Sequence, residues 1–164
     1  DDIENRRNSH SNSSIRDAGA YCPPSDINDV EANITYGLEL LYAGVVADAE
    51  KHFERCCREH GSVRYQLHSA EVTCVCAILS MEKSDIEVAK KRLWAVEAAA
   101  AHLGHKKHKW GVWKSKQGHG DPWLDTVSEE ERQLWTHTLQ AEASLMVALC
   151  HALGAAESMT EILK

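Results

Sequence analysis

The segment at residues 25–60 constrains the fold most, because its apolar side chains recur every three or four positions on both sides of Gly44. This spacing places them along one face of each of two helices, which we expect at about 26–42 and 45–60. Gly61 can close the second helix in the left-handed conformation. The sequence therefore predicts a helical hairpin. Its apolar positions are Ile27, Val30, Ile34, Leu38, Leu41, Val46, Ala49, Phe53 and Cys56.

Small residues occur where the two helices have to approach closely, and the single phenylalanine of the chain lies among them. In order, the pattern is Gly37-x6-Gly44-x4-Ala49-x3-Phe53-x2-Cys56. This alternation of small residues with one aromatic residue resembles the signature of the tetratricopeptide repeat. The resemblance implies a helical hairpin that stacks against further hairpins, with Phe53 in the core between the first three helices.

The rest of the chain continues the helical pattern and carries no strand signal. Further helices are expected at about 63–82, 84–102 and 128–154, followed by a sixth that begins at 155. The expected N-terminal caps are Ser25 or Asp26, a capping box at 84–87, and a second capping box at 128–131. Within the fourth helix Ala89 and Leu93 repeat the spacing of Ala49 and Phe53. We therefore predict an all-α fold of antiparallel hairpins stacked as a tetratricopeptide-like solenoid.

Apolar faces predict how two of these helices pack. The helix at 63–82 is apolar on two sides, so we expect it to be central. The helix at 128–154 is amphipathic, and its alanines are expected to let it pack closely. Its apolar face consists of Leu134, Ala141, Leu145, Ala148, Leu149 and Ala152.

Composition divides the chain into two parts. Residues 1–24 are polar, rich in asparagine and serine, and end in two prolines, which predicts a disordered or loosely attached arm. Residues 25–164 form the expected helical-repeat domain, which includes a basic linker at 104–127. No apolar run reaches the roughly 20 residues that cross a bilayer, so we expect no transmembrane segment. A start without methionine and an end inside an expected helix indicate a piece of a longer protein.

Three runs of sequence resemble the opening part of the tetratricopeptide-repeat protein 39 family, which includes outer-mitochondrial-membrane and inclusion-body-clearance proteins. They are LYAGVVADAE at 41–50, ILSMEKSDIEVA at 78–89, and SEEER at 128–132 leading to Ala141-Glu142. The family pattern is a hairpin, a helix that ends in an acidic turn, a DI-x-x-A helix, a charged linker, and a helix with an acidic start. The resemblance covers about residues 27–164, the N-terminal part of a longer family, and here the linker is rich in lysine, tryptophan and histidine.

The basic linker is the strongest charge feature. Five lysines and no acidic residue occur between 102 and 120, whereas the net charge of the whole chain is −7, so the remaining residues carry −12. Tryptophans among lysines are suited to an acidic partner protein or an anionic membrane surface, with nucleic acid less favoured. For the tryptophans we favour the alternative that they fold the linker back onto the helices, because three exposed tryptophans would form an unusually large apolar patch. The candidate contact residues are Lys106, Lys107, Lys109, Trp110, Trp113, Lys114 and Lys116.

The inner face of the first helix provides the other candidate contacts. A carboxylate clamp needs basic and amide side chains on such a face. The residues here are instead Glu31, Ile34, Leu38 and Leu41. An apolar partner helix in the groove is therefore the better match, through the three apolar residues.

No catalytic, cofactor or metal site is predicted. Cys56 and Cys57 share a helix with His60, but no third group orients such a pair. His102, His105 and His108 recur every third residue, and His119 follows. Such a spacing could bind zinc on a helix, but Gly104 interrupts the helix, so an exposed polar linker is favoured. The six cysteines contain no C-x-x-C. The adjacent Cys56 and Cys57 cannot bridge internally, nor can Cys74 and Cys76, which are two apart, and this indicates reduced thiols in a cytoplasmic protein.

These features predict a non-catalytic helical-repeat module for protein–protein interaction, within a larger scaffold or adaptor. The alternative is a peripheral module that binds an anionic membrane surface through the basic linker. Either function fits a cytoplasmic location, including the cytosolic face of an organelle membrane.

Overall fold

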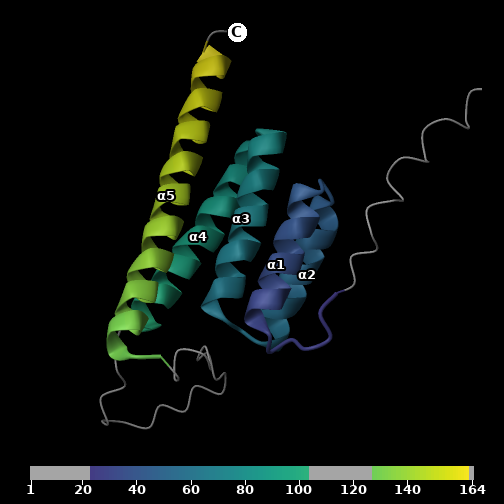
Figure 1. Ribbon diagram of the computed structural model, residues 1–164. Helices are drawn as coiled ribbons and strands as arrows, with labels where there is room; N and C mark the ends of the chain where they lie inside the picture. Colours follow the sequence, from purple (N-terminus) through teal and green to yellow (C-terminus); the bar gives the residue numbers. More distant parts are fainter. Residues whose placement is uncertain (1–22, 104–126, 163–164) are drawn as a thin grey trace, which may run out of the picture.

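The computed structural model describes residues 23–103 and 127–162, with side chains up to residue 156. The described chain is all-helical, as predicted. Its helices are α1 (Val30–Tyr42), α2 (Val46–Glu59), α3 (Val63–Ser80), α4 (Lys83–Leu103) and α5 (Glu129–Ile162). They lie side by side in chain order, from the α1–α2 hairpin on one side to α5 on the other (Figure 1). The expected arm at 1–24 and linker at 104–127 fall almost wholly outside the described residues.

Helix α1 begins later than predicted because a different residue caps it. Asp29 accepts a hydrogen bond from the backbone N–H of Ala32, so neither Ser25 nor Asp26 is the cap. The Asp26 carboxylate instead accepts from the backbone of Asn28, at 2.8 Å. The corners after α1 and α2 match the prediction, since Gly44 and Gly61 both have positive φ.

Helix α3 is central, as its two apolar sides predict. It packs against α2 and α4 and also contacts α1 and α5. Val72 joins the core cluster around Phe53, whereas Leu67, Cys74 and Ala77 belong to a second cluster shared with α4 and α5. The described fold therefore has two core clusters, one on each side of α3.

The two predicted capping boxes have opposite outcomes. At the start of α5, the Ser128 N–H donates to Glu131 Oε2 at 2.9 Å, and the Glu131 N–H donates back to Ser128 Oγ at 3.2 Å. The box at 84–87 is wrong, because α4 already begins at Lys83. Asp85 instead accepts a hydrogen bond from the Ser80 hydroxyl, at 2.7 Å, which links the end of α3 to the start of α4.

Helix α5 is a single helix of 34 residues, so the predicted break at Gly154 and the sixth helix are wrong. A glycine inside a helix costs only about 1 kcal/mol relative to alanine, which the neighbouring turns can offset. At 1.5 Å per residue α5 is about 51 Å long. Its C-terminal end extends beyond the ends of α3 and α4 (Figure 1).

The face of α5 that packs against the other helices is not the predicted one. Its buried residues include Leu139, Ala143 and Cys150, which lie against α3 and α4. The predicted apolar face lies on the opposite side and is exposed to solvent. We call this face the outer stripe; it consists of Leu134, Ala141, Leu145, Ala148, Leu149 and Ala152. Because α5 is apolar on two opposite sides, its periodicity alone cannot select the side that packs.

Candidate functional site

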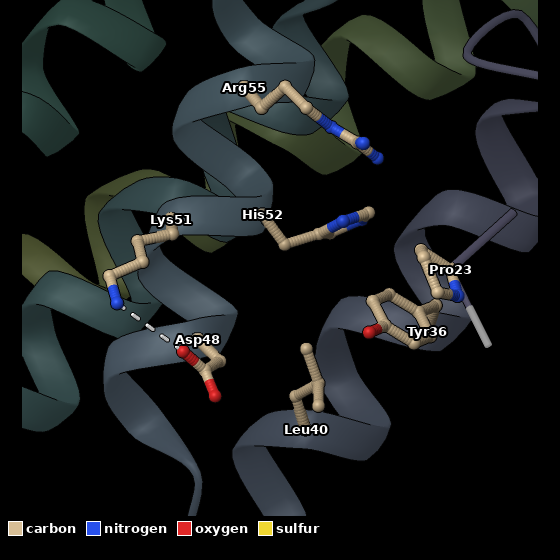
Figure 2. Close-up of a pocket in the computed structure, with 7 residues that line it drawn as sticks. All are labelled: Pro23, Tyr36, Leu40, Asp48, Lys51, His52 and Arg55. Carbon is tan, nitrogen blue, oxygen red and sulfur yellow. Dashed lines mark hydrogen bonds and ion pairs between the residues drawn. The ribbon is translucent and has the colours of Figure 1, made fainter. Parts of the chain in front are cut away.

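A cavity of about 280 Å³ lies between α1 and α2. Figure 2 shows Tyr36 and Leu40 of α1 on one side of this space and His52 of α2 on the other, near the Lys51–Asp48 ion pair. The lining residues are Pro23, Tyr36, Leu40, Asp48, Lys51, His52 and Arg55. The cavity is thus apolar on the α1 side and charged on the α2 side.

His52 is fixed in the cavity wall by the backbone of α1. Its Nε2 lies 2.8 Å from the carbonyl oxygen of Asn33, and because a carbonyl only accepts, Nε2 carries the proton. The ring of Tyr36 meets the imidazole edge-on, with centroids 4.8 Å apart. The Asn33 side-chain amide in turn donates to the carbonyl oxygens of Asp26 and Asp29, each at 2.8 Å. Asn33 is fully buried, so this network ties the segment before α1 to α2.

The thiol nearest to this network is that of Cys56, which is buried beside the His52 ring. Cys56 Sγ lies 3.5 Å from His52 Nε2, but burial raises the pKa of the Cys56 thiol and lowers the pKa of the His52 imidazole. Both shifts favour the neutral forms, whereas nucleophilic catalysis needs a thiolate. Burial also raises the pKa of Cys57 to about 11. The ring of His60, which the sequence suggested as a base, packs edge-on against Tyr65.

The lowered pKa of His52 predicts a pH-dependent stability. An unfolded histidine titrates near pH 6.5, so as the pH falls below about 6.5 the unfolded chain gains a proton before the folded chain does. The contribution of neutral His52 is therefore complete above that pH and is lost as the pH falls towards the lowered folded pKa. Urea unfolding at about pH 7 and about pH 5 should show a smaller pH dependence for His52→Gln than for the parent chain.

The matched control for this prediction is His137→Gln, because His137 lies on the exposed side of α5. It should leave the pH dependence close to that of the parent chain. An equal pH dependence for the parent and His52→Gln would contradict a role for His52.

Glu31, on the predicted inner face of α1, serves an interhelical ion pair. Its carboxylate pairs with Arg64 of α3, and the hydrogen bond from Arg64 lowers the pKa of Glu31. The Arg64 guanidinium also lies over the ring of Trp135 on α5, 5.2 Å from the centroid. Arg64 is itself buried, so it joins three helices.

The predicted contact residues fall into two groups. Ile34 is only 6% exposed and belongs to the core cluster around Phe53, so it offers no surface to a partner. Leu38 and Leu41 are half-buried against the same cluster. The linker residues lie outside the described part of the chain: Lys106, Lys107, Lys109, Trp110, Trp113, Lys114 and Lys116.

The outer stripe of α5 is the apolar surface that the sequence interpretation missed. Its leucines are exposed by 65% at Leu134, 72% at Leu145 and 43% at Leu149. The helical periodicity of these residues is visible in the sequence, but periodicity alone predicts a face that packs against other helices. Large exposed apolar surfaces are typical of sites that contact a protein or a membrane.

Helix α5 is also long and apolar enough to cross a membrane, contrary to the expectation from the sequence. It is the one such helix among the described residues. An 18-residue stretch within Glu129–Ala156 has a mean hydropathy of 1.3, and 17% of that stretch is buried. Length and composition alone give this result, and a core helix of a soluble protein can meet the same criteria.

We compared the chain with known proteins, and no family model, no curated protein and no solved structure matches it.

Proposed function

We propose that this chain is a non-catalytic helical-repeat interaction module that binds an apolar partner helix along the outer stripe of α5. The observation that carries the proposal is the exposure of Leu134, Leu145 and Leu149 on a helix whose other side is packed. We further propose that the module is part of a larger cytoplasmic scaffold or adaptor, as the resemblance to the tetratricopeptide-repeat protein 39 family implies.

Packing inside the hairpins supports a tetratricopeptide-like solenoid. In the first hairpin, a Cβ added at Gly37 would lie 2.3 Å from Cζ of Phe53, so the small residue and the aromatic ring are in direct contact. In the second hairpin the corresponding Ala77, Ala89 and Leu93 are all fully buried. Helix α5 would then be the first helix of a third hairpin, with α4 on one side and an open face on the other.

The outer stripe has the dimensions of a helix-binding surface. From Leu134 to Ala152 it extends about 27 Å along α5, at 1.5 Å per residue. Large leucines are interspersed with Ala141 and Ala148, and small residues allow a second helix to approach closely. An amphipathic helix that lies along such a surface contacts it through residues at every third and fourth position.

Acidic residues beside the outer stripe define the charge of the partner. Glu130, Glu131 and Glu142 are exposed on α5 and flank the stripe on the helical wheel. A partner helix with lysine or arginine along the edges of its apolar face would meet these carboxylates. Complementary charges of this kind speed association and disfavour an acidic partner.

A synthetic helix with a leucine face and lysine edges, long enough to cover the outer stripe, is the direct probe. We expect the chain to bind it, and the triple variant Leu134→Gln, Leu145→Gln, Leu149→Gln to bind at least about tenfold more weakly, which corresponds to about 1.4 kcal/mol. Fluorescence anisotropy of the labelled probe helix measures the affinity of the parent chain and that of the triple variant. The matched control is Leu79→Gln, since Leu79 is 71% exposed but lies on α3.

The control should bind the probe helix as the parent chain does. Equal binding by the parent chain and the triple variant would contradict the proposal. A probe with glutamates in place of its lysines should bind more weakly, and stronger binding of that probe would contradict the charge assignment.

A second candidate is a peripheral module that binds an anionic membrane surface, such as the cytosolic face of an organelle, through the basic linker. The exposed leucines of the outer stripe support it because they add apolar surface that lipid could cover. Each lysine near such a surface contributes about 1 kcal/mol, weakened by salt. Sedimentation with vesicles of phosphatidylserine and phosphatidylcholine tests this. Binding should be lost when Lys106, Lys107, Lys109, Lys114 and Lys116 are changed to glutamine, and vesicle binding unchanged by these substitutions would contradict this candidate.

A further inference from the structure

Two buried cysteines from distant parts of the sequence are in contact between α3 and α5. Cys74 Sγ and Cys150 Sγ lie 3.6 Å apart, although the residues are 76 positions apart. Both side chains are fully buried in the second core cluster. We propose that these two thiols are a redox modification site, which a peroxide converts into a disulfide that links α3 to α5.

The approach that a bond requires is small. A disulfide has an S–S distance of about 2.05 Å, so the sulfurs need to approach by roughly 1.5 Å. Alanine side chains at Ala70, Ala77 and Ala143 belong to the same cluster, so these neighbouring groups are small. Helix α5 packs mainly on α4 and has a smaller contact with α3. A modest shift of α5, together with rotation of the Cys74 and Cys150 side chains about their Cα–Cβ bonds, would therefore bring the sulfurs within bonding distance.

A cavity provides the route for a small oxidant. It has a volume of about 280 Å³, lies between α4 and α5, and has Cys150 in its wall. Lys83, Glu87 and Lys90 also line it, and Lys90 is ion-paired with Glu87. Cys150 itself has no exposed surface, so oxidation depends on local opening of α5 away from α4.

Access from the cavity determines which thiol reacts first. Burial and the neighbouring Cys150 thiol raise the pKa of Cys74, and Cys74 does not line the cavity. Cys150 is therefore assigned the first step, because it is the one of the two that borders the cavity. This order predicts a slow reaction that accelerates when α5 opens.

The chemistry uses hydrogen peroxide as the oxidant and proceeds in two balanced steps. The Cys150 thiol releases its proton, and the thiolate attacks one peroxide oxygen. The O–O bond breaks, and the departing hydroxide takes up the released proton, which leaves a sulfenic acid and water. Cys74 Sγ then attacks Cys150 Sγ, the S–O bond breaks, and the hydroxide leaves as a second water with the proton from Cys74. The two thiols have lost two electrons and two protons in total.

The bond would covalently restrain α5 against α3. It would close a loop that contains α4, and closing such a long loop restricts the unfolded chain. The outer stripe lies on the opposite side of α5, so the bond would leave the proposed docking surface uncovered. The inference is thus independent of the proposed function.

Peptide mapping of the folded chain after treatment with hydrogen peroxide tests the proposal. We expect a disulfide-linked peptide pair that contains Cys74 and Cys150, and a melting temperature several degrees higher that returns to its starting value after reduction. Cys74→Ala and Cys150→Ala should each abolish the linked pair and the shift. Cys76→Ala, a half-buried position on α3, should retain both.

The parent chain alone can overturn the inference, so it does not depend on whether the alanine variants fold. Peroxide that oxidises only Cys57 and Cys76, while Cys74 and Cys150 remain alkylatable after unfolding, would refute it. A disulfide between any other pair in the folded monomer would also refute it.

Discussion

Phe53→Ala is expected to lower the free energy of unfolding by about 3–5 kcal/mol, the usual cost of removing a buried aromatic side chain. Phe53 has no exposed surface. Its ring packs against the His68 ring of α3 with centroids 5.7 Å apart, and it lies where any side chain at position 37 of α1 would have to go. Removing it would therefore leave a void that borders three helices.

Urea denaturation of the parent chain and the variant measures this loss. The control is Leu79→Ala, which removes an apolar side chain that is already 71% exposed and should change stability by no more than about 0.5 kcal/mol. A loss below about 1 kcal/mol for Phe53→Ala would mean that the ring does not hold the first hairpin together. Since domains have only about 5–15 kcal/mol of stability, the expected loss is a large fraction of the total.

Local features of the fold could be predicted from the sequence. Three of these features depend on residues within a few positions of one another. They are the corner at Gly44, the end of α2 at Gly61, and the capping box from Ser128 to Glu131. The contact between Gly37 and Phe53 could also be predicted, because a short corner forces two consecutive helices to pack together. In these cases the nearby sequence contains both partners of the interaction.

Where the nearby sequence allows two structures equally well, the sequence could not predict which one forms. Asp26 and Asp29 are both capable N-caps, and the contacts of Asn33 with both carbonyl groups favour a start after Asp29. Helix α5 has two apolar sides, and only packing against α4 determines which one is buried. Gly154 can end a helix or lie within one, and here the helix continues.

The candidate sites depended even more on contacts between distant residues. The contact of His52 with the backbone of Asn33 spans 19 positions, and the Cys74–Cys150 contact spans 76, so no spacing rule identifies either one. Ile34 was expected to face a partner, but the inner side of α1 is occupied by α2 and α3. The exposed leucines of α5 had a clear periodicity, and only their solvent exposure distinguishes a docking surface from a core.

Gly37→Ala is expected to destabilise the fold although alanine is the better helix former. Helix propensity alone favours the substitution by about 1 kcal/mol. Against this, the added Cβ would lie 2.3, 2.6 and 2.8 Å from three atoms of the Phe53 ring, closer than nonbonded carbon atoms can approach. The ring is fully buried and cannot move away freely, so we expect a net loss of about 3 kcal/mol, at the upper end of overpacking costs.

Gly154→Ala is the matched control, since it makes the same change inside α5, where an added Cβ would lie 4.0 Å from the Ile86 side chain. It should stabilise the chain by up to about 1 kcal/mol, because helix propensity acts there without a clash. If Gly37→Ala also stabilised the chain, the close contact between α1 and the Phe53 ring would be disproved.

A double variant isolates the contact between the two residues. Phe53→Leu removes ring atoms that the alanine Cβ would meet, so Gly37→Ala should cost less in the Phe53→Leu background than in the parent chain. Residues in direct contact show coupling energies of about 0.5–3 kcal/mol, whereas independent residues give additive losses. Additive losses in urea denaturation would therefore mean that the cost of Gly37→Ala does not come from the Phe53 ring. A smaller cost in the Phe53→Leu background would assign it to the contact between the smallest residue of α1 and the largest apolar side chain of α2.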